Sequence, residues 1–203
     1  MQYTEIKSAA LGYADRKDAE TIDMMDTFLR IVEARINRKL NTQKMTARAT
    51  LNTVVDQEYY GLPNDFTGLR DIQLNSDDKV STMAYLNPEQ MNDMSGYTTP
   101  HSIYYTIINQ QLQIYPTQEN SEIEIVYYQN VPQLDDSNTT NWLSEFNPDC
   151  YIFGLLVEIS SFVKDAQSMM AWEQRFISSV NDIELEDDAS RWSGSMLLIR
   201  NDR

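Results

Sequence analysis

Apolar residues near the N-terminal end of the chain recur every three or four positions, which is the spacing of an amphipathic helix. A short helix is expected over residues 4–13, and a longer one over about residues 18–42, which the side chain of Asp18 can cap. The apolar stripe of the longer helix consists of Ile22, Met25, Leu29, Val32, Ile36 and Leu40. Its second half carries several cations, which suit the negative end of the helix dipole and would also suit an acidic partner.

A second helical region follows Asn147, Pro148 and Asp149, which supply a capping side chain, a proline at the first helical position and an acid in the first turn. Two helices are expected there, forming an antiparallel hairpin that turns near residues 164–168. The apolar stripe of the first is Ile152, Leu155, Leu156, Ile159, Phe162 and Val163, and that of the second is Met169, Trp172, Phe176, Val180 and Ile183.

Between these helical regions the period of the pattern changes to two, which predicts β-strands. The expected strands cover residues 45–53, 58–62, 69–74, 102–108, 111–116 and 122–129. The pair Asn109-Gln110 predicts a tight hairpin between two of them. Residues 87–100 are expected to form a long connection with one helical turn at 88–91, and residues 130–141 have the composition of a linker.

Each long helix has one apolar face that must be covered, so the N- and C-terminal helices are expected to share one bundle. The predicted fold class is therefore α+β: a helical bundle formed by N- and C-terminal helices, with an inserted antiparallel β domain and an extended C-terminal arm. The expected boundaries are 1–43 and 142–190 for the bundle, 44–141 for the β domain with its linker, and 191–203 for the arm.

The C-terminal arm ends in an apolar run that follows Gly194. It is expected to pair as a strand, either on its own sheet or on the sheet edge of a neighbouring molecule. The neighbouring molecule is favoured, because no residues return the chain to the β domain. The predicted partner interface is Trp192, Met196, Leu197, Leu198, Ile199 and Arg200.

The net charge of −15 is unevenly distributed along the chain. Residues 1–50 carry nine Lys or Arg against seven Asp or Glu, whereas residues 71–163 carry thirteen acids and one base, Lys79. A strongly acidic surface repels phosphate, and the chain has no Gly-rich phosphate loop, so tight binding to nucleic acid is disfavoured. The acids of residues 71–163 either keep the protein soluble or form a surface with a specific role.

The sequence contains little reactive chemistry, and no catalytic, cofactor or metal residue is predicted. Cys150 is the one cysteine and His101 the one histidine, and neither lies in a nucleophile or zinc motif. The acid pairs Asp77-Asp78 and Asp135-Asp136 could suggest a hydrolase or a calcium site, but catalytic carboxylates normally converge from different segments, and DDSNTTN lacks the Gly and closing Glu of a calcium loop. Neither a membrane span nor a secretory signal is expected.

The segment EYYGLPNDFTGLRDIQLN, residues 58–75, reads as a strand, a rigid corner at Pro63 and a second strand. It resembles the head-to-tail adaptor proteins of short-tailed bacteriophages, the tail-tubular-protein-A-like group. The residues that carry this resemblance are Tyr60, Leu62, Pro63, Asp65, Phe66, Leu69, Arg70 and Ile72, then Leu112, Ile114, Pro116, the strand 123–128, Val131, Pro132, Leu134, Trp142, Leu143, Pro148, Asp149 and the helix opening 151–155. Together they span about residues 20–185, and Phe153-Gly154 replaces the Tyr-Gly pair that is usual in the family.

The resemblance implies a structural virion protein, assembled in the host cytoplasm. Such adaptors form a ring, generally of about twelve copies, between the portal protein and the tail nozzle protein, and DNA passes through it without sequence-specific binding. An acidic lumen would let DNA slide, and the C-terminal arm would join subunits or clasp the portal. The candidate acids of the channel are Asp77, Asp78, Glu122 and Glu124.

Two other interpretations stay open. One is a different neck, tail-completion or fibre-docking protein of the virion, and docking of tail fibres to the adaptor itself is also open. The other is a ligand-binding module with a tyrosine-rich surface formed by Tyr104, Tyr105, Tyr127 and Tyr128. The oligomeric mass separates these interpretations, because a ring that assembles with a portal favours the adaptor.

Overall fold

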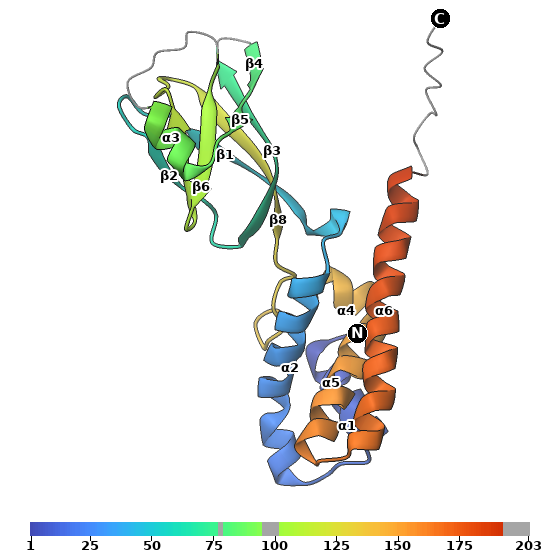
Figure 1. The fold of residues 1–203 in the computed structure, drawn as a ribbon. Helices are drawn as coiled ribbons and strands as arrows, with labels where there is room; N and C mark the ends of the chain where they lie inside the picture. The colour runs from blue at the N-terminus through green and yellow to red at the C-terminus, as the bar shows by residue number, and fades with distance from the viewer. Residues whose placement is uncertain (77–78, 95–101, 193–203) are drawn as a thin grey trace, which may run out of the picture. The chain divides into compact units, whose positions relative to one another are not determined.

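The structure, a computed structural model, describes residues 1–76, 79–94 and 102–192 (Figure 1). The chain divides into two compact units. A helical unit consists of Met1–Lys44 with Val131–Arg203, and a β unit consists of Met45–Asn130. The α+β class predicted from the sequence is confirmed, since helices from both ends of the chain form one unit and the strands form the other.

The helical unit begins with α1 (Tyr3–Tyr13) and α2 (Ala19–Lys39), close to the predicted ranges. Asp18 caps α2 as predicted, because its carboxylate accepts the backbone N–H of Thr21 at 3.0 Å. The short turn η1 (Gln43–Met45) follows at the boundary of the two units. After the β unit come α4 (Trp142–Phe146), α5 (Pro148–Phe162) and α6 (Ala166–Trp192).

The start of α5 differs in one respect from the prediction. Pro148 occupies the first turn as predicted, but the side chain of Asn147 makes no capping hydrogen bond. The reason is α4, a five-residue helix that the sequence pattern did not predict. Asn147 closes α4 by donating its backbone N–H to the carbonyl of Leu143 at 2.8 Å, so it serves as the end of one helix and the start of the next.

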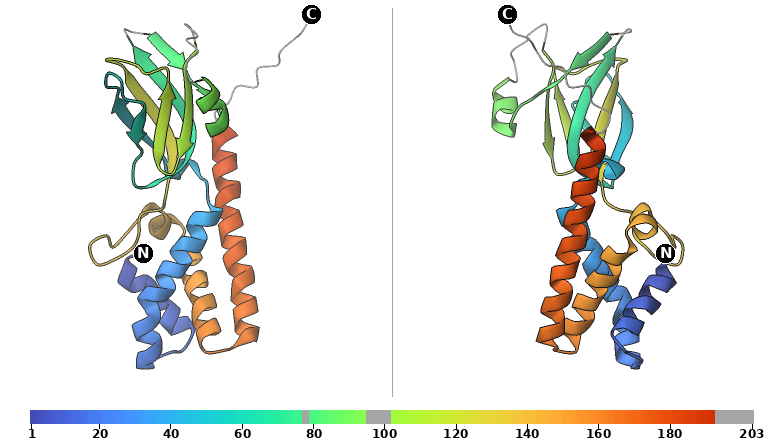
Figure 2. Two further views of the ribbon diagram at one scale, coloured as in Figure 1. Left: turned by 60° about the vertical axis from the view of Figure 1, so that its left-hand side comes forward. Right: turned by 90° about the vertical axis from the view of Figure 1, so that its right-hand side faces the viewer.

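The hydrophobic core of the helical unit surrounds α5, which packs against α1, α2 and α6 (Figure 2). Gly154 lets α5 and α2 approach closely, since a Cβ there would lie 2.6 Å from Cγ1 of Val32. The buried apolar residues of these helices include Ile6, Ala10, Met25, Phe28, Leu29, Val32, Ile36, Tyr151, Leu155, Leu156, Ile159, Phe176, Val180 and Ile183. The stripes were predicted too broadly, because Ile22 and Phe162 are 46% and 40% exposed.

The β unit contains two four-stranded sheets. Sheet A has the order β1-β8-β3-β4, and sheet B has the order β2-β7-β6-β5. The strands are β1 (Thr46–Asn52), β2 (Tyr59–Gly61), β3 (Phe66–Ser76), β4 (Lys79–Thr82), β5 (Ala84–Tyr85), β6 (Tyr104–Ile108), β7 (Gln111–Tyr115) and β8 (Glu122–Gln129). The helix α3 (Pro88–Met94) lies in the predicted connection and is longer than the single turn expected there.

Six strands match the predicted ones, and the differences concern short or exposed elements. The strands β4 and β5 were not predicted, because four exposed residues and two residues carry no periodic signal. The sheets are also not antiparallel throughout, since β5 pairs parallel with β6. The hairpin between β6 and β7 is confirmed: Asn109 and Gln110 both have positive φ, 46° and 64°, as a type I′ turn requires.

The segment 58–75 folds as the sequence indicated, as two strands joined by a corner at Pro63. The corner is closed by a hydrogen bond from the N–H of Phe66 to the carbonyl of Pro63 at 3.0 Å. The ring of Phe66 then stacks on Tyr127, with 5.7 Å between ring centroids, and the hydroxyl of Tyr127 donates to Asp65 at 3.0 Å. The corner thus brings β3 onto the core of the β unit.

The C-terminal end of the described chain is helical. Arg191 and Trp192, expected to open the extended arm, are the last residues of α6. The apolar run at 196–199 and Arg200 lie outside the described residues.

Candidate functional site: the outer face of sheet A and the polar network of the bundle

Two of the acids predicted to line a channel lie on the same face of sheet A. The core face of this sheet carries Ile123 and Ile125, so the intervening Glu122 and Glu124 lie on the outer face. Glu122 is exposed, and Glu124 forms an ion pair with Arg48 of β1 at 3.0 Å. The other two predicted acids, Asp77 and Asp78, lie outside the described residues.

The end of this outer face is hollowed into an open cavity of about 710 Å³. At this end, Glu122 of β8 lies directly between its cross-strand neighbours, Asn52 of β1 and Asn75 of β3. The lining is mainly amide and hydroxyl side chains: Asn52, Thr53, Asn75, Ser76, Lys79, Val80, Asn120, Ser121 and Glu122. The surface is hydrophilic, and its single cation does not form the basic patch that holds nucleic acid by its phosphates.

The predicted partner interface can be placed only at its start. Trp192 ends α6, and the remaining predicted residues, Met196 to Arg200, lie outside the described part of the chain. Near the end of α6 the helical unit has a smaller pocket of about 220 Å³, which the sequence did not indicate. It is lined by Thr42, Gln43, Lys44, Trp142, Asn147, Ile183, Glu186, Asp187 and Ser190. Beside it, the 68%-exposed ring of Phe146 has the ammonium of Lys44 4.4 Å from its centroid.

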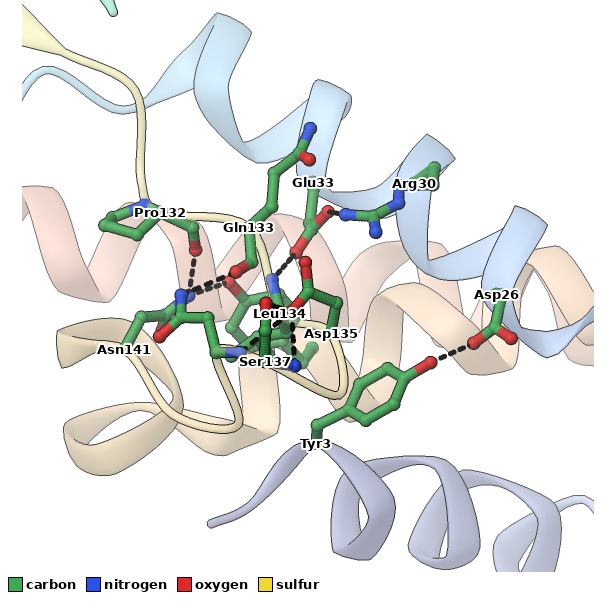
Figure 3. A network of polar contacts seen from close by, with 12 residues as sticks. Tyr3, Asp26, Arg30, Glu33, Pro132, Gln133, Leu134, Asp135, Ser137 and Asn141 are labelled. Atoms are coloured by element: carbon green, nitrogen blue, oxygen red, sulfur yellow. Dashed lines mark hydrogen bonds and ion pairs between the residues drawn. The ribbon is translucent and has the colours of Figure 1, made fainter.

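A buried carboxylate on α2 holds the segment through which the chain returns from the β unit (Figure 3). Glu33 is 4% exposed and accepts the backbone N–H of Leu134 at 2.7 Å. Arg30, one turn earlier, pairs with it at 3.1 Å. Burial raises the pKa of the Glu33 carboxyl. The Leu134 N–H and Arg30 act to lower this pKa, but the effect of burial is larger. Nearby, the N–H of Val131 donates to the side chain of Asn37 at 2.8 Å.

The far end of the same segment is held by Asn141. Its side-chain amide donates to the carbonyl of Pro132 at 2.6 Å and to the hydroxyl of Tyr151 at 2.8 Å (Figure 3). Its side-chain oxygen accepts the N–H of Ser144 at 2.7 Å, which caps α4. Residues 130–141 were predicted as a linker from their composition, but all of them except Asn130 belong to the helical unit, where buried polar side chains hold them.

A second polar cluster joins three helices of the bundle. The guanidinium of Arg35 on α2 binds Glu158 of α5 at 2.9 Å and Glu173 of α6 at 2.6 Å. It also lies 4.7 Å from the ring centroid of Phe176. The cations of α2 were attributed to the helix dipole or an acidic partner, and for Arg35 the partners are acids of the same unit.

The single cysteine of the chain, Cys150, is buried in the helical unit. Burial raises the pKa of the Cys150 thiol to about 12, so this sulfur stays protonated at neutral pH. Within the described ranges, no group of three or more His, Cys, Asp or Glu is arranged to hold a metal ion. No helix there is long and apolar enough to cross a membrane. His101 lies outside the described residues.

The tyrosines proposed for a ligand-binding surface are divided between core and surface. Tyr127 is buried in the core of the β unit, and Tyr105 is half-buried against Tyr85, with 5.6 Å between ring centroids. Tyr104 and Tyr128 are also half-buried. Tyr105 and Tyr127 thus pack in or against the core of the β unit, whereas Tyr104 and Tyr128 are partly accessible.

Comparison with known proteins identifies one family. The sequence model of the SU10 adaptor protein family matches residues 1–198, nearly the whole chain. No curated protein matches the chain.

Proposed function

The chain belongs to the SU10 adaptor protein family, and from this premise we propose that it forms a ring between the portal and the tail nozzle, through which phage DNA passes. The family places the protein among structural phage adaptors, which are virion components and assemble with other virion proteins such as portal and tail. The observation that carries the proposal is the match over residues 1–198, which includes both units of the fold. The ring, its copy number of about twelve, its formation in the host cytoplasm and any docking of tail fibres are parts of the proposal.

A channel role for sheet A is supported by the chemistry of its outer face. Glu122, Glu124 and Asp71 face away from the core, and the cavity at the end of this face is lined mostly by uncharged polar groups. The cations described on this face have partners within the sheet, since Arg48 pairs with Glu124 and Arg70 donates to the hydroxyl of Thr46. A surface of this kind neither repels nor binds the phosphate backbone strongly, so DNA can move past it.

The partner role of the C-terminal arm is supported by its sequence, with four apolar residues at 196–199 after a glycine. An extended segment of this type adds main-chain hydrogen bonds and apolar contacts to a partner. We propose the portal as this partner.

Electron microscopy of the purified protein, alone and mixed with its portal protein, tests the central proposal. Rings bound to the portal are expected. A protein that stays monomeric and does not bind the portal would contradict the proposal, and rings that bind only nozzle or fibre proteins would favour a different place in the tail.

Two variants then separate the parts of the proposal. Deletion of residues 193–203 is expected to abolish portal binding while the helical content is kept, and unchanged binding would exclude the arm as the contact. Replacement of Asn52 and Glu122 by Lys is expected to make assembled rings retain DNA at low salt. The same two charges placed on α2, at Glu20 and Thr27, are the control, and equal retention by both variants would mean that sheet A does not line the channel.

A further inference from the structure

Sheet A has two edges without a partner strand among the described residues. The strand β1 forms one edge and β4 the other. β1 pairs with β8 over seven residues in unbroken register, and it contains no proline or bulge. A long, regular edge strand presents a row of unpaired N–H and C=O groups, which readily bind another strand. The edges of sheet B are shorter, with three residues in β2 and two in β5.

The outward-facing backbone groups of β1 can be identified from the ladder. One pair beyond the end of β1, the N–H of Thr53 donates to the carbonyl of Ser121 at 2.8 Å. Because bonded and non-bonded pairs alternate in an antiparallel ladder, Ala49 and Leu51 bond to β8. The N–H and C=O groups of Arg48 and Thr50 therefore point away from the sheet. No backbone hydrogen bond from the described part of the chain reaches them.

The same alternation identifies the free groups of β4. Glu122 and Glu124 do not bond to β1, so they bond to Asn75 and Gln73 of β3. The intervening Leu74 of β3 bonds to Ser81 of β4. The backbone groups of Val80 and Thr82 consequently point outward at the second edge, again without a backbone partner in the described ranges.

The directions of β1 and β4, and the faces on which their side chains lie, allow these two edge strands to pair between copies. Each pairing in sheet A is antiparallel, so the outer strands of this four-stranded sheet run in opposite directions. A second copy placed beside the first in the same orientation therefore brings its β1 antiparallel to β4. Residues directly opposite in an antiparallel pair have their side chains on one face. Val80 and Thr82 share the outer face with Arg48 and Thr50, so the core and outer faces both continue across the junction.

Among the described residues, β4 has a neighbouring strand on one side only, which is β3. All four of its residues are exposed, and Val80 is 66% exposed although β-branched residues favour paired strands. Pairing with another strand would give Val80 a cross-strand neighbour on the side away from Asn75.

We propose that β4 of one copy pairs antiparallel with β1 of the next, so that sheet A continues from subunit to subunit. The contact joins two different surfaces of the chain, and such a head-to-tail contact generates a ring when its rotation closes. The inference rests on the proposed ring and adds the residues that join its subunits.

Disulfide trapping tests the pairing directly. One preparation carries Thr50→Cys or Arg48→Cys, the other carries Val80→Cys or Thr82→Cys, and the two are mixed, assembled with the portal and oxidised. Opposed strands bring Cα atoms within the 4.4–6.8 Å that a disulfide needs, so at least one of the four combinations is expected to give a covalent dimer. Each preparation alone is the control and should stay monomeric on a denaturing gel, because Cys150 is buried.

The result separates the pairing from the ring. Rings that form without a cross-link in any combination overturn the strand pairing and leave the ring intact. Failure of the unmodified protein to form rings overturns both.

A backbone substitution provides a second, independent readout. Thr50→Pro removes an outward N–H and keeps the internal ladder at Ala49 and Leu51, and edge strands tolerate proline. At least a tenfold loss of assembled rings is expected, with an unchanged circular dichroism spectrum. Thr50→Ala retains the N–H and should assemble normally. Equal assembly of the two variants would overturn the proposal, and a misfolded proline variant leaves the decision to the disulfide experiment.

Discussion

Glu33 accepts the backbone N–H of Leu134 at 2.7 Å and so joins positions 101 residues apart in the chain. The whole β unit lies between these two residues, and the bond fixes the point where the chain re-enters the helical unit. A buried carboxylate is costly unless it is paired and hydrogen-bonded. Glu33 meets both conditions, through Leu134 and Arg30, and the α2 surface that holds residues 131–134 depends on it.

The stability of the helical unit is expected to depend on the ionisation of Glu33. Burial raises the pKa of this carboxyl above its ordinary value of 4.5, so the folded protein binds the proton more tightly than the unfolded chain. The stability that this tighter proton binding gives to the folded state is fully present below pH 4.5, and it is lost as the pH rises through the raised pKa of Glu33. Asp26 and Asp135 have lowered pKa values and act in the opposite direction. Glu33→Gln, whose amide oxygen can still accept the Leu134 N–H, isolates the Glu33 contribution.

The measurement is the free energy of unfolding in urea between pH 4 and 7 for both proteins. The wild type is expected to lose stability relative to Glu33→Gln as the pH rises. Glu20→Gln, on the exposed side of the same helix, controls for the change of one charge. A wild-type curve that stays parallel to that of Glu33→Gln would show that this carboxyl does not titrate differently on folding.

Substitution of Gly154 by Ala is expected to destabilise the bundle by about 1–3 kcal/mol, because the added methyl overpacks a filled interface. Its Cβ would lie 2.6 Å from Cγ1 of Val32 and 3.3 Å from the ring of Phe176. Val32 is fully buried and its branched side chain cannot easily move aside. The matched control is Gly12→Ala, where no atom lies within 4 Å and a gain of about 0.5–1 kcal/mol is expected in a helix. Thermal unfolding of both variants checks the pair, and equal shifts would contradict the close-packing argument.

Much of the fold could be predicted because the apolar residues of a long helix or strand recur at a regular spacing several times. The helix α2 has five buried apolar residues at helical spacing, and in β8 the buried Ile123, Ile125 and Tyr127 alternate with more exposed residues. The helix α4 and the strand β5 were missed because five and two residues are too short to show a period. Exposed ends of predicted stripes, such as Ile22, could not be identified, since local spacing does not say where a neighbouring helix ends.

Most hydrogen-bond and ion-pair partners in the polar network of the bundle could not be predicted from the sequence. One signal for Glu33 existed, because it is four residues after Leu29 and three before Ile36, on the face predicted to be buried. Its partner Leu134 and the partners of Arg35 lie more than 100 residues away and can be paired only by the fold. The composition of residues 130–141 suggested a linker, because Asn, Ser and Asp favour turns whether or not their side chains are later buried.

The turn between β6 and β7 offers a stabilising substitution. Gln110 has a φ of 64°, a left-handed conformation that is unfavourable for a residue with a Cβ. Gln110→Gly is expected to raise the free energy of unfolding by about 0.5–1 kcal/mol, since glycine adopts this conformation without steric cost. The exposed hydrogen bond from Gln110 to the carbonyl of Phe66, at 3.3 Å, is lost and reduces the gain slightly. Gln111→Gly, inside β7, is the control and should destabilise, and urea unfolding that shows the same sign for both would refute the turn argument.

Removal of the Arg35 side-chain charge is expected to destabilise the bundle more than any other change to the cations of α2. Arg35 is 19% exposed and binds two carboxylates, and Arg35→Met leaves Glu158 and Glu173 close together without their common counter-ion. Breaking such a partly buried cluster costs about 3 kcal/mol, whereas Arg38→Met on the exposed side of α2 should change stability by less than about 0.5 kcal/mol. If the cost comes from the unpaired acids, then adding Glu158→Gln and Glu173→Gln to Arg35→Met should restore a large part of the lost stability. Urea denaturation of the single, double and triple variants measures this coupling, and a triple variant no more stable than Arg35→Met would show that packing against Phe176, not charge, is the contribution of Arg35.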